Sequence, residues 1–130
     1  RISIGSRLGE RHPIASTGLG KALILDKTEA DWIDFYAEPG AKFDSAARAV
    51  WLERMHGYAQ KGYAFDLEEN EDQIRCVAAP IRSVNGQIVA ALSVSSAAQY
   101  MSDARMTELT KTVTEAADAI SADLGWSPKP

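Results

Sequence analysis

The sequence predicts an α+β domain in which an antiparallel pair of strands lies beside several helices. Two strand-forming runs, 73–84 and 87–96, are separated by Asn85-Gly86 alone, a preferred sequence for a tight β-hairpin. An amphipathic segment from 103 to 124 follows, with apolar residues at steps of three and four. Its predicted core stripe is Met106, Leu109, Val113, Ala116, Ala117, Ile120 and Leu124. A length of 130 residues suits one compact domain rather than two.

Composition excludes several classes of protein. A hydrophobic fraction of 45% with 25% charged residues is typical of a folded globular chain. The net charge of -4 argues against nucleic-acid binding by this chain, because phosphate contacts require a basic surface. A single cysteine, Cys76, excludes an internal disulfide and a multi-cysteine zinc site, and it suits the reducing cytoplasm. The longest apolar runs are too short to predict a membrane span.

The first 25 residues are expected to contain a short strand and a glycine-rich helix. The strand is predicted from the alternating residues Ile2, Ile4 and Leu8. The helix falls within residues 14–25 and follows an N-cap at Ser16 or Thr17. Gly18 and Gly20 occupy its first turn, where glycine costs about 1 kcal/mol relative to alanine. Close packing of another backbone explains such glycines, and so does the approach of a ligand; both explanations stay open.

Two more helices and a strand are predicted before the hairpin. A capping box at residues 28–31 begins a short helix that ends before Pro39-Gly40. A longer helix runs from Asp44 or Ser45 to Gly62, with a core stripe of Val50, Trp51, Met55, Tyr58 and Ala59. Residues 63–66 are extended. The acidic run at 67–72 is expected to be a solvated loop, because its spacing does not match a calcium loop.

Side-chain alternation divides the predicted hairpin into two faces. If Asn85-Gly86 form a two-residue type I′ turn, Arg82 pairs with Val89, and Cys76 pairs with Ser95. One face is aliphatic and suits packing under a helix: Val77, Ala79, Ile81, Ile88, Ala90, Leu92 and Val94. The other face is small and mildly polar: Ile74, Cys76, Ala78, Ala91, Ser93 and Ser95.

The polar face is the strongest candidate for a binding site. Small side chains leave volume, and hydroxyls that are removed from water need hydrogen-bond partners. A pocket for a small polar ligand satisfies both conditions, whereas local hydrogen bonding and packing is the alternative. Catalysis by Cys76 would require an adjacent base, and neither His12 nor His56 has a motif partner. His12, His56 and Cys76 are scattered along the chain and do not have the spacing of metal ligands.

An ordered set of motifs resembles the effector-binding C-terminal domain of IclR-type transcriptional regulators. The motifs are residues 13–23 (PIASTGLGKAL), 57–66 (GYAQKGYAFD), Glu68-Glu69, 76–81 (CVAAPI), Asn85-Gly86 and 90–95 (AALSVS). They follow one another over nearly the whole chain. No single motif is decisive, but their order is specific.

The resemblance implies a GAF/profilin-like fold, an antiparallel sheet flanked by helices, for residues 1–130 as a single effector-binding domain. It implies binding of a small carboxylate metabolite that modulates a repressor's DNA binding through an N-terminal winged helix-turn-helix. It also implies a homodimer or homotetramer, with neither a cofactor nor a membrane as partner. The chain begins at Arg1 rather than methionine, so we expect a fragment. Because the family's domains are longer at the N-terminus, the resemblance implies that the DNA-binding domain, the linker helix and the first strands of the effector domain are absent from this chain.

Carried over to this sequence, the family's pocket falls on Gly18, Leu19, Asp66, Ile74, Cys76, Ser93 and Ser95, with His12 at a lining position. Four of these residues already share the polar face of the hairpin. Gln73 replaces a glycine that is common in the family, so the backbone there is expected to differ. His12, with Ala15 in place of a larger residue, indicates a polar, roomy pocket that suits a hydroxylated acid such as a sugar acid. Two alternatives stay open: a Cys76-dependent enzyme, and an oligomerisation module without a ligand.

Overall fold

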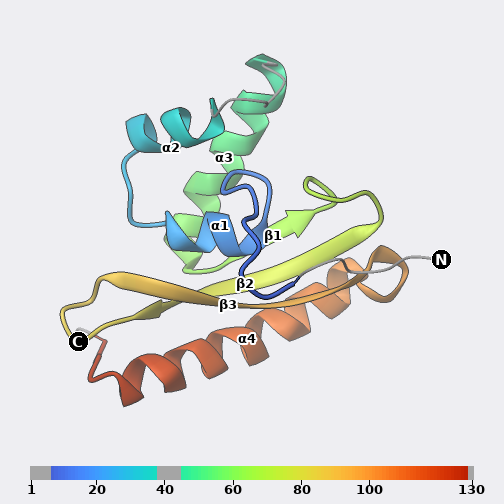
Figure 1. Cartoon of the computed structure of the whole chain (residues 1–130). Coiled ribbons are helices and arrows are strands. Elements are labelled where there is room, and N and C mark those ends of the chain that lie inside the picture. Colours follow the sequence, from blue (N-terminus) through green and yellow to red (C-terminus); the bar gives the residue numbers. More distant parts are fainter. Residues whose placement is uncertain (1–6, 38–44, 129–130) are drawn as a thin grey trace.

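A three-stranded antiparallel sheet separates two layers of helices (Figure 1). The computed structural model describes residues 7–37 and 45–128. The strands are β1 (Ala64–Leu67), β2 (Ile74–Arg82) and β3 (Ile88–Ala97), in the order β1-β2-β3. The helices are α1 (Gly18–Leu23), α2 (Glu29–Tyr36), α3 (Ser45–Lys61), the short 3-10 helix η1 (Ala98–Tyr100) and α4 (Asp103–Asp123). The predicted α+β class is confirmed.

The two helical layers bury separate cores on opposite faces of the sheet. Helix α4 lies along one face, whereas α1 and α3 cover the other face and α2 packs against α3 (Figure 1). The core under α4 contains Val77, Ala79, Ile81, Met101, Met106, Val113 and Ala117. The core on the other side contains Ala22, Ile24, Leu25, Trp32, Trp51, Met55, Tyr58, Ala64, Cys76 and Ala78. Cys76 and Ala78 therefore face α1, as the alternation of side chains predicts.

Local signals locate the helix ends well where the structure describes them. Thr17 caps α1, and the capping box between Thr28 and Asp31 is formed at the start of α2. Gly62 has a φ of 84° directly after α3, a left-handed conformation that glycine adopts without strain. Leu8 lies in an exposed turn rather than a strand, so that part of the prediction is wrong. The predictions at Ile2, Ile4, Pro39-Gly40 and Asp44 lie outside the described residues.

The predicted core stripes are too wide. In α3, Trp51, Met55 and Tyr58 are buried, but Val50 and Ala59 are exposed. In α4, the buried residues are Met106, Val113, Ala117 and Ser121, whereas Ala116, Ile120 and Leu124 are exposed. A single sheet face contacts only a narrow stripe of α4, so the flanking apolar positions stay in solvent.

The turn of the hairpin differs from the predicted type I′ turn. Gly86 N donates to Ser83 O, and Ser83 N donates to Gln87 O, so the loop contains three residues rather than two. Gly86 has a φ of 85°, whereas Asn85 does not have the positive φ that a type I′ turn requires. The pattern is a type I turn followed by a glycine in the left-handed conformation.

A β-bulge in β3 then restores the predicted register. Arg82 pairs with Ile88 and Ile81 pairs with Ala90, so Val89 is the extra residue. Beyond the bulge, Cys76 pairs with Ser95, as predicted. Before it, Ile88 points toward the α1 side and packs with the core there, so its predicted place on the α4 face is wrong.

The bulge also explains why a serine of α4 is buried. A bulge interrupts the ladder of hydrogen bonds between two strands, and Arg82 N donates to Ser121 Oγ at 2.9 Å. The Ser121 hydroxyl donates in turn to Ala117 O at 2.8 Å. The buried Ser121 hydroxyl therefore accepts one hydrogen bond and donates another. An apolar residue at this position would leave Arg82 N without its acceptor.

Candidate functional site

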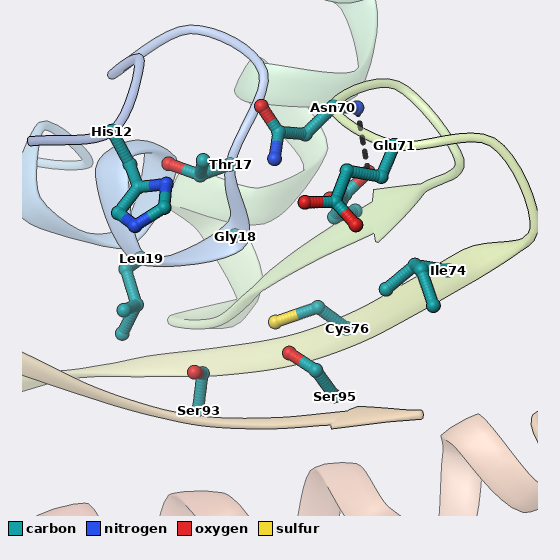
Figure 2. A pocket seen from close by; sticks show the side chains of 11 residues that line it. His12, Thr17, Gly18, Leu19, Asn70, Glu71, Ile74, Cys76, Ser93 and Ser95 are labelled. Carbon is teal, nitrogen blue, oxygen red and sulfur yellow. Dashed lines mark hydrogen bonds between the residues drawn. The ribbon is translucent and has the colours of Figure 1, made fainter. Parts of the chain in front are cut away.

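The floor of a pocket is built from side chains that lie in one row across the sheet (Figure 2). Asp66 of β1 pairs with Cys76 of β2, and Cys76 pairs with Ser95 of β3. Paired residues on neighbouring strands point to the same face. The carboxylate, the thiol and the hydroxyl therefore face α1 together. Ser93, which pairs with Ala78, lies two residues away along β3 on the same face.

The first turn of α1 forms the wall beside this floor. The Thr17 hydroxyl accepts a hydrogen bond from Gly20 N at 3.0 Å and donates to a main-chain carbonyl at 2.6 Å. Gly18 packs directly on the floor, because a Cβ atom there would lie 2.7 Å from Cys76 Sγ. The N–H groups of Gly18 and Leu19 find no hydrogen-bond acceptor among the described residues. Two main-chain donors are therefore available beside the pocket.

Close packing explains both glycines of α1. A Cβ atom at Gly20 would lie 2.2 Å from Ile14 O and 2.5 Å from Ile14 Cα, which are backbone atoms. At Gly18 the close neighbour is the side chain of Cys76. Of the two explanations that the sequence leaves open, packing accounts for Gly20. Gly18 is required by packing and also lines the pocket.

The rim of the pocket comes from two loops. His12 precedes α1, and Asn70 and Glu71 belong to residues 68–73, which join β1 to β2 and are called the rim loop below. All three side chains line the pocket, with His12 and Glu71 on opposite sides of its mouth (Figure 2). The pocket has a volume of about 150 Å³ and is open to solvent on this side.

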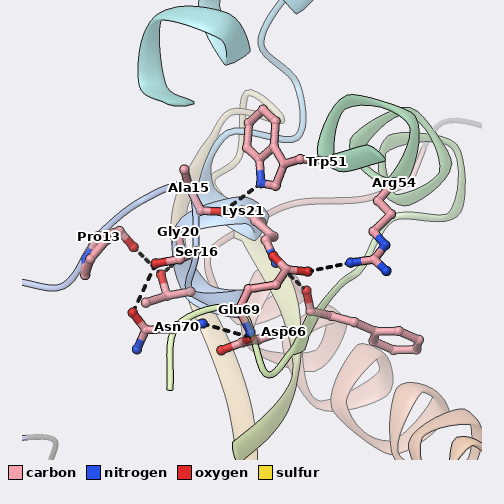
Figure 3. A network of polar contacts seen from close by, with 12 residues as sticks. Pro13, Ala15, Ser16, Gly20, Lys21, Trp51, Arg54, Asp66, Glu69 and Asn70 are labelled. Carbon is pink, nitrogen blue, oxygen red and sulfur yellow. Dashed lines mark hydrogen bonds and ion pairs between the residues drawn. The ribbon is translucent and has the colours of Figure 1, made fainter. Parts of the chain in front are cut away.

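Polar contacts hold the rim loop against the rest of the domain (Figure 3). Asp66 Oδ1 accepts hydrogen bonds from Glu69 N at 2.8 Å and from Asn70 N at 3.4 Å. Ser16 Oγ donates to Asn70 Oδ1 at 3.0 Å. Asp66 therefore belongs to the floor and also holds the rim loop in place.

The first and last residues of the rim loop have a backbone conformation that is unusual for residues other than glycine. Glu68 has a φ of 65° and Gln73 a φ of 63°, and both are in the left-handed region. Non-glycine residues pay about 1–2 kcal/mol to adopt this conformation. At Gln73 the backbone therefore takes a conformation that a glycine would favour, and the expected difference from the family's backbone stays a prediction. The rim loop depends on its tertiary contacts to stay in place.

The structure brings all eight predicted site residues to this one pocket. They are His12, Gly18, Leu19, Asp66, Ile74, Cys76, Ser93 and Ser95. Their role in binding an effector stays a prediction. Ala15, in contrast, is not a lining residue but packs against the core on the α1 side, so it does not bear directly on the size of the pocket.

Three lining residues are missing from the sequence prediction. Thr17 is correctly predicted as a cap but also lines the pocket. Asn70 and Glu71 lie in the acidic run that is predicted to be a solvated loop; Glu71 is exposed, as that prediction implies, and both residues also line the pocket. No local pattern marks these two residues, because a side chain at the rim of a pocket and one in solvent have the same sequence signature.

The pocket contains more acidic than basic groups. Asp66 and Glu71 supply two carboxylates and His12 an imidazole, and no Lys or Arg is among its eleven described lining residues. Burial raises the pKa of the Asp66 carboxyl above its ordinary value of 3.8, although hydrogen bonds from the rim loop and the charge of Lys21 oppose this shift. The neutral carboxyl therefore persists to higher pH than it would in water.

Cys76 does not have the environment of a nucleophile. Burial raises the pKa of its thiol, and hydrogen bonds with Ser95 and Ser93 offset this effect only in part. A reactive cysteine requires the opposite shift, because the thiolate is the nucleophile. Among residues 7–37 and 45–128, His, Cys, Asp and Glu side chains form no group of three that could hold a metal ion. No helix in the same ranges is long and apolar enough to cross a membrane.

Known proteins are similar to this chain in both sequence and fold. The chain is 32% identical over 127 residues to the HTH-type transcriptional regulator XynR of Escherichia coli (strain K12), covering 93% of this chain and 50% of that protein. It is 32% identical over 130 residues to KdgR, an HTH-type transcriptional regulator from the same strain, covering 96% and 49%. The chain thus spans about half the length of these curated relatives. Both are named as transcriptional regulators.

The fold agrees with a solved member of this group. The crystal structure of Thermotoga maritima IclR superposes with a TM-score of 0.80 and 29% identity, covering 97% of this chain and 53% of that one. A family model described as the bacterial transcriptional regulator IclR C-terminal domain matches residues 1–122. The chain belongs to the IclR family of transcriptional regulators, as an effector-binding C-terminal domain.

Proposed function

We propose that the pocket between α1 and the sheet binds a small carboxylate metabolite, and that this binding modulates DNA binding by a winged helix-turn-helix elsewhere in the protein. The observation that carries the proposal is the convergence of Gly18, Leu19, Ser93 and Ser95 on one pocket above Cys76. These groups bring main-chain N–H donors and hydroxyls to a space that side chains leave open. An oligomerisation module without a ligand would have that space filled.

The donors favour a carboxylate, and the acceptors favour hydroxyl groups on the same ligand. The N–H groups of Gly18 and Leu19 and the hydroxyls of Ser93 and Ser95 donate to carboxylate oxygens. Hydrogen bonds to charged groups contribute about 1.5–3 kcal/mol each, which makes them a substitute for Lys or Arg, neither of which is among the described lining residues. Asp66, on the floor, accepts from ligand hydroxyls. A hydroxylated acid such as a sugar acid uses both sets of groups.

The regulatory part of the proposal rests on the relatives. The chain spans about half of two proteins that are named HTH-type transcriptional regulators, and its own net charge is -4. A DNA-reading segment in the other half accounts for both facts. We further propose a cytoplasmic homodimer or homotetramer that acts as a repressor. Regulation requires that the ligand bind two states of this assembly with different affinity, because equal affinity shifts no equilibrium.

Calorimetric titration of the chain with sugar acids, aromatic acids and keto acids tests the proposal. At least one acid is expected to bind with one-site stoichiometry and a free energy of roughly -5 to -8 kcal/mol, typical of metabolite binding. The corresponding sugar alcohol, which lacks the carboxylate, is the matched control and is expected to bind at least tenfold more weakly. Saturable binding by none of the acids, or equal binding of acid and alcohol, would contradict the proposal.

A further inference from the structure

Lys21 is a fully buried charge that lies outside the pocket lining. Its exposed fraction is 0%, and its Nζ atom donates to Phe65 O at 2.8 Å. The same ammonium forms an ion pair with the Glu69 carboxylate (Figure 3). A buried ammonium without a counter-charge costs several kcal/mol. Lys21 therefore fixes the position of Glu69 strongly.

Glu69 is the second residue of the rim loop and is held from two sides. Its Oε2 atom contacts Lys21 of α1, and its Oε1 atom accepts from Arg54 Nη1 of α3 at 3.1 Å. The next two residues, Asn70 and Glu71, line the pocket. An ion pair between α1 and the rim loop therefore sets the position of the side chains that close the mouth.

The rim loop makes several other contacts with the body of the domain. Its end residues Glu68 and Gln73 have a left-handed backbone conformation, which is unfavourable for residues other than glycine. Among the described residues, its remaining links to the body of the domain include the hydrogen bonds of Asp66 and Ser16 and one from Ala98 N to Gln73 O at 2.7 Å. Two partly exposed ion pairs, Glu68–Arg75 and Glu69–Arg54, add to them. Lys21 supplies the most deeply buried of these contacts.

We infer that Lys21 and Glu69 are positioning residues, whose ion pair holds the rim loop closed over the pocket and thereby sets access to it. Neither residue touches the pocket, yet loss of the pair opens the loop while the sheet and the helices stay folded. The consequence for ligand affinity rests on the function proposed above. The opening of the loop itself does not depend on the proposed function, because it occurs in the chain without ligand.

Cys76 provides a probe that needs no ligand. It is the single cysteine of the chain and lies buried on the pocket floor, so its alkylation by iodoacetamide reports access to the pocket. Glu69→Gln is the cleanest variant, because it removes the charge with little change of shape. Lys21 affects the pKa of the Cys76 thiol directly, whereas Glu69 is not among the causes of that shift.

We expect Glu69→Gln to accelerate alkylation of Cys76 at least tenfold, with a rate nearly independent of urea below the unfolding transition. Alkylation through local opening depends only weakly on urea, because local opening exposes little surface. Alkylation through global unfolding has the same urea dependence as the unfolding equilibrium. Glu108→Gln, which breaks an exposed Arg105–Glu108 pair on α4, is the matched control and is expected to leave the rate within twofold. Arg54→Gln removes the exposed partner of Glu69 and is expected to have a smaller effect.

Two outcomes would overturn the inference. One is an alkylation rate in Glu69→Gln within twofold of the parent chain. The other is an increase that shows the full urea dependence of global unfolding, which would assign the ion pair to general stability alone. Either result leaves the calorimetric test of ligand binding intact, so the two proposals fail independently.

Discussion

Replacing Gly20 by alanine is expected to lower the free energy of unfolding by about 3 kcal/mol, at the upper end of what overpacking costs. The added Cβ atom would lie 2.2 Å from Ile14 O and 2.5 Å from Ile14 Cα. Both are backbone atoms, so no flexible side chain can move aside to make room. The segment before α1 would have to shift as a whole, and urea unfolding followed by circular dichroism measures the cost.

Gly57→Ala is the matched control for this substitution. Gly57 lies inside α3, and a Cβ atom there meets nothing within 4 Å. Alanine in a helix interior is more favourable than glycine by about 0.5–1 kcal/mol, so this variant is expected to be more stable than the parent. A Gly20→Ala chain that unfolds at the same urea concentration as the parent would show that α1 packs less closely on the Ile14 backbone than the 2.2 Å separation implies.

The double variant Ser93→Ala with Ser95→Ala is expected to weaken binding of the tightest acid about 100-fold or more. Each hydroxyl that donates to a carboxylate contributes about 1.5–3 kcal/mol, and the loss of two exceeds a factor of 100 unless solvent replaces them. Both serines lie on the pocket face of β3, opposite Ala78 and Cys76. Calorimetric titration of the variant and the parent chain under identical conditions measures the change.

Ser96→Ala controls for the chemical change on the same strand. Ser96 is the next residue along β3, pairs with Arg75 and points to the opposite face. Its replacement is expected to leave the affinity within twofold of the parent. An unchanged affinity in the Ser93 and Ser95 double variant would place the ligand elsewhere or exclude hydroxyl contacts with it.

The hairpin shows how sequence reasoning can reach a correct register through a wrong turn. Asn85-Gly86 is compatible with a two-residue turn and with the three-residue loop that forms. The bulge at Val89 compensates for the extra loop residue, so Cys76 still pairs with Ser95. Only Ile88, between the loop and the bulge, changes face. A bulge has no strong sequence signal, and it could not be predicted from the pattern of strand residues.

The part of the pocket floor that the hairpin forms was predictable because alternation along two paired strands is a local property. The rim loop's part of the mouth was not, because it depends on contacts between distant segments. Lys21 and Glu69 are 48 residues apart in the chain, and Ser16 and Asn70 are separated by 54. Charged residues in an acidic run are usually solvated, so composition alone predicts the wrong environment for Glu69. Only the packing of α1 against the β1–β2 connection identifies its partner.

The most direct test of the central claim is an amide NMR titration of the 130-residue chain with the acid that binds most tightly in calorimetry. If the carboxylate lies between α1 and the sheet, the largest saturable shifts will occur at Gly18, Leu19, Ser93 and Ser95. Residues of α4 such as Met106 and Val113, on the far side of the sheet, will shift little. Largest shifts at α4, or shifts spread evenly over the chain, would contradict the account.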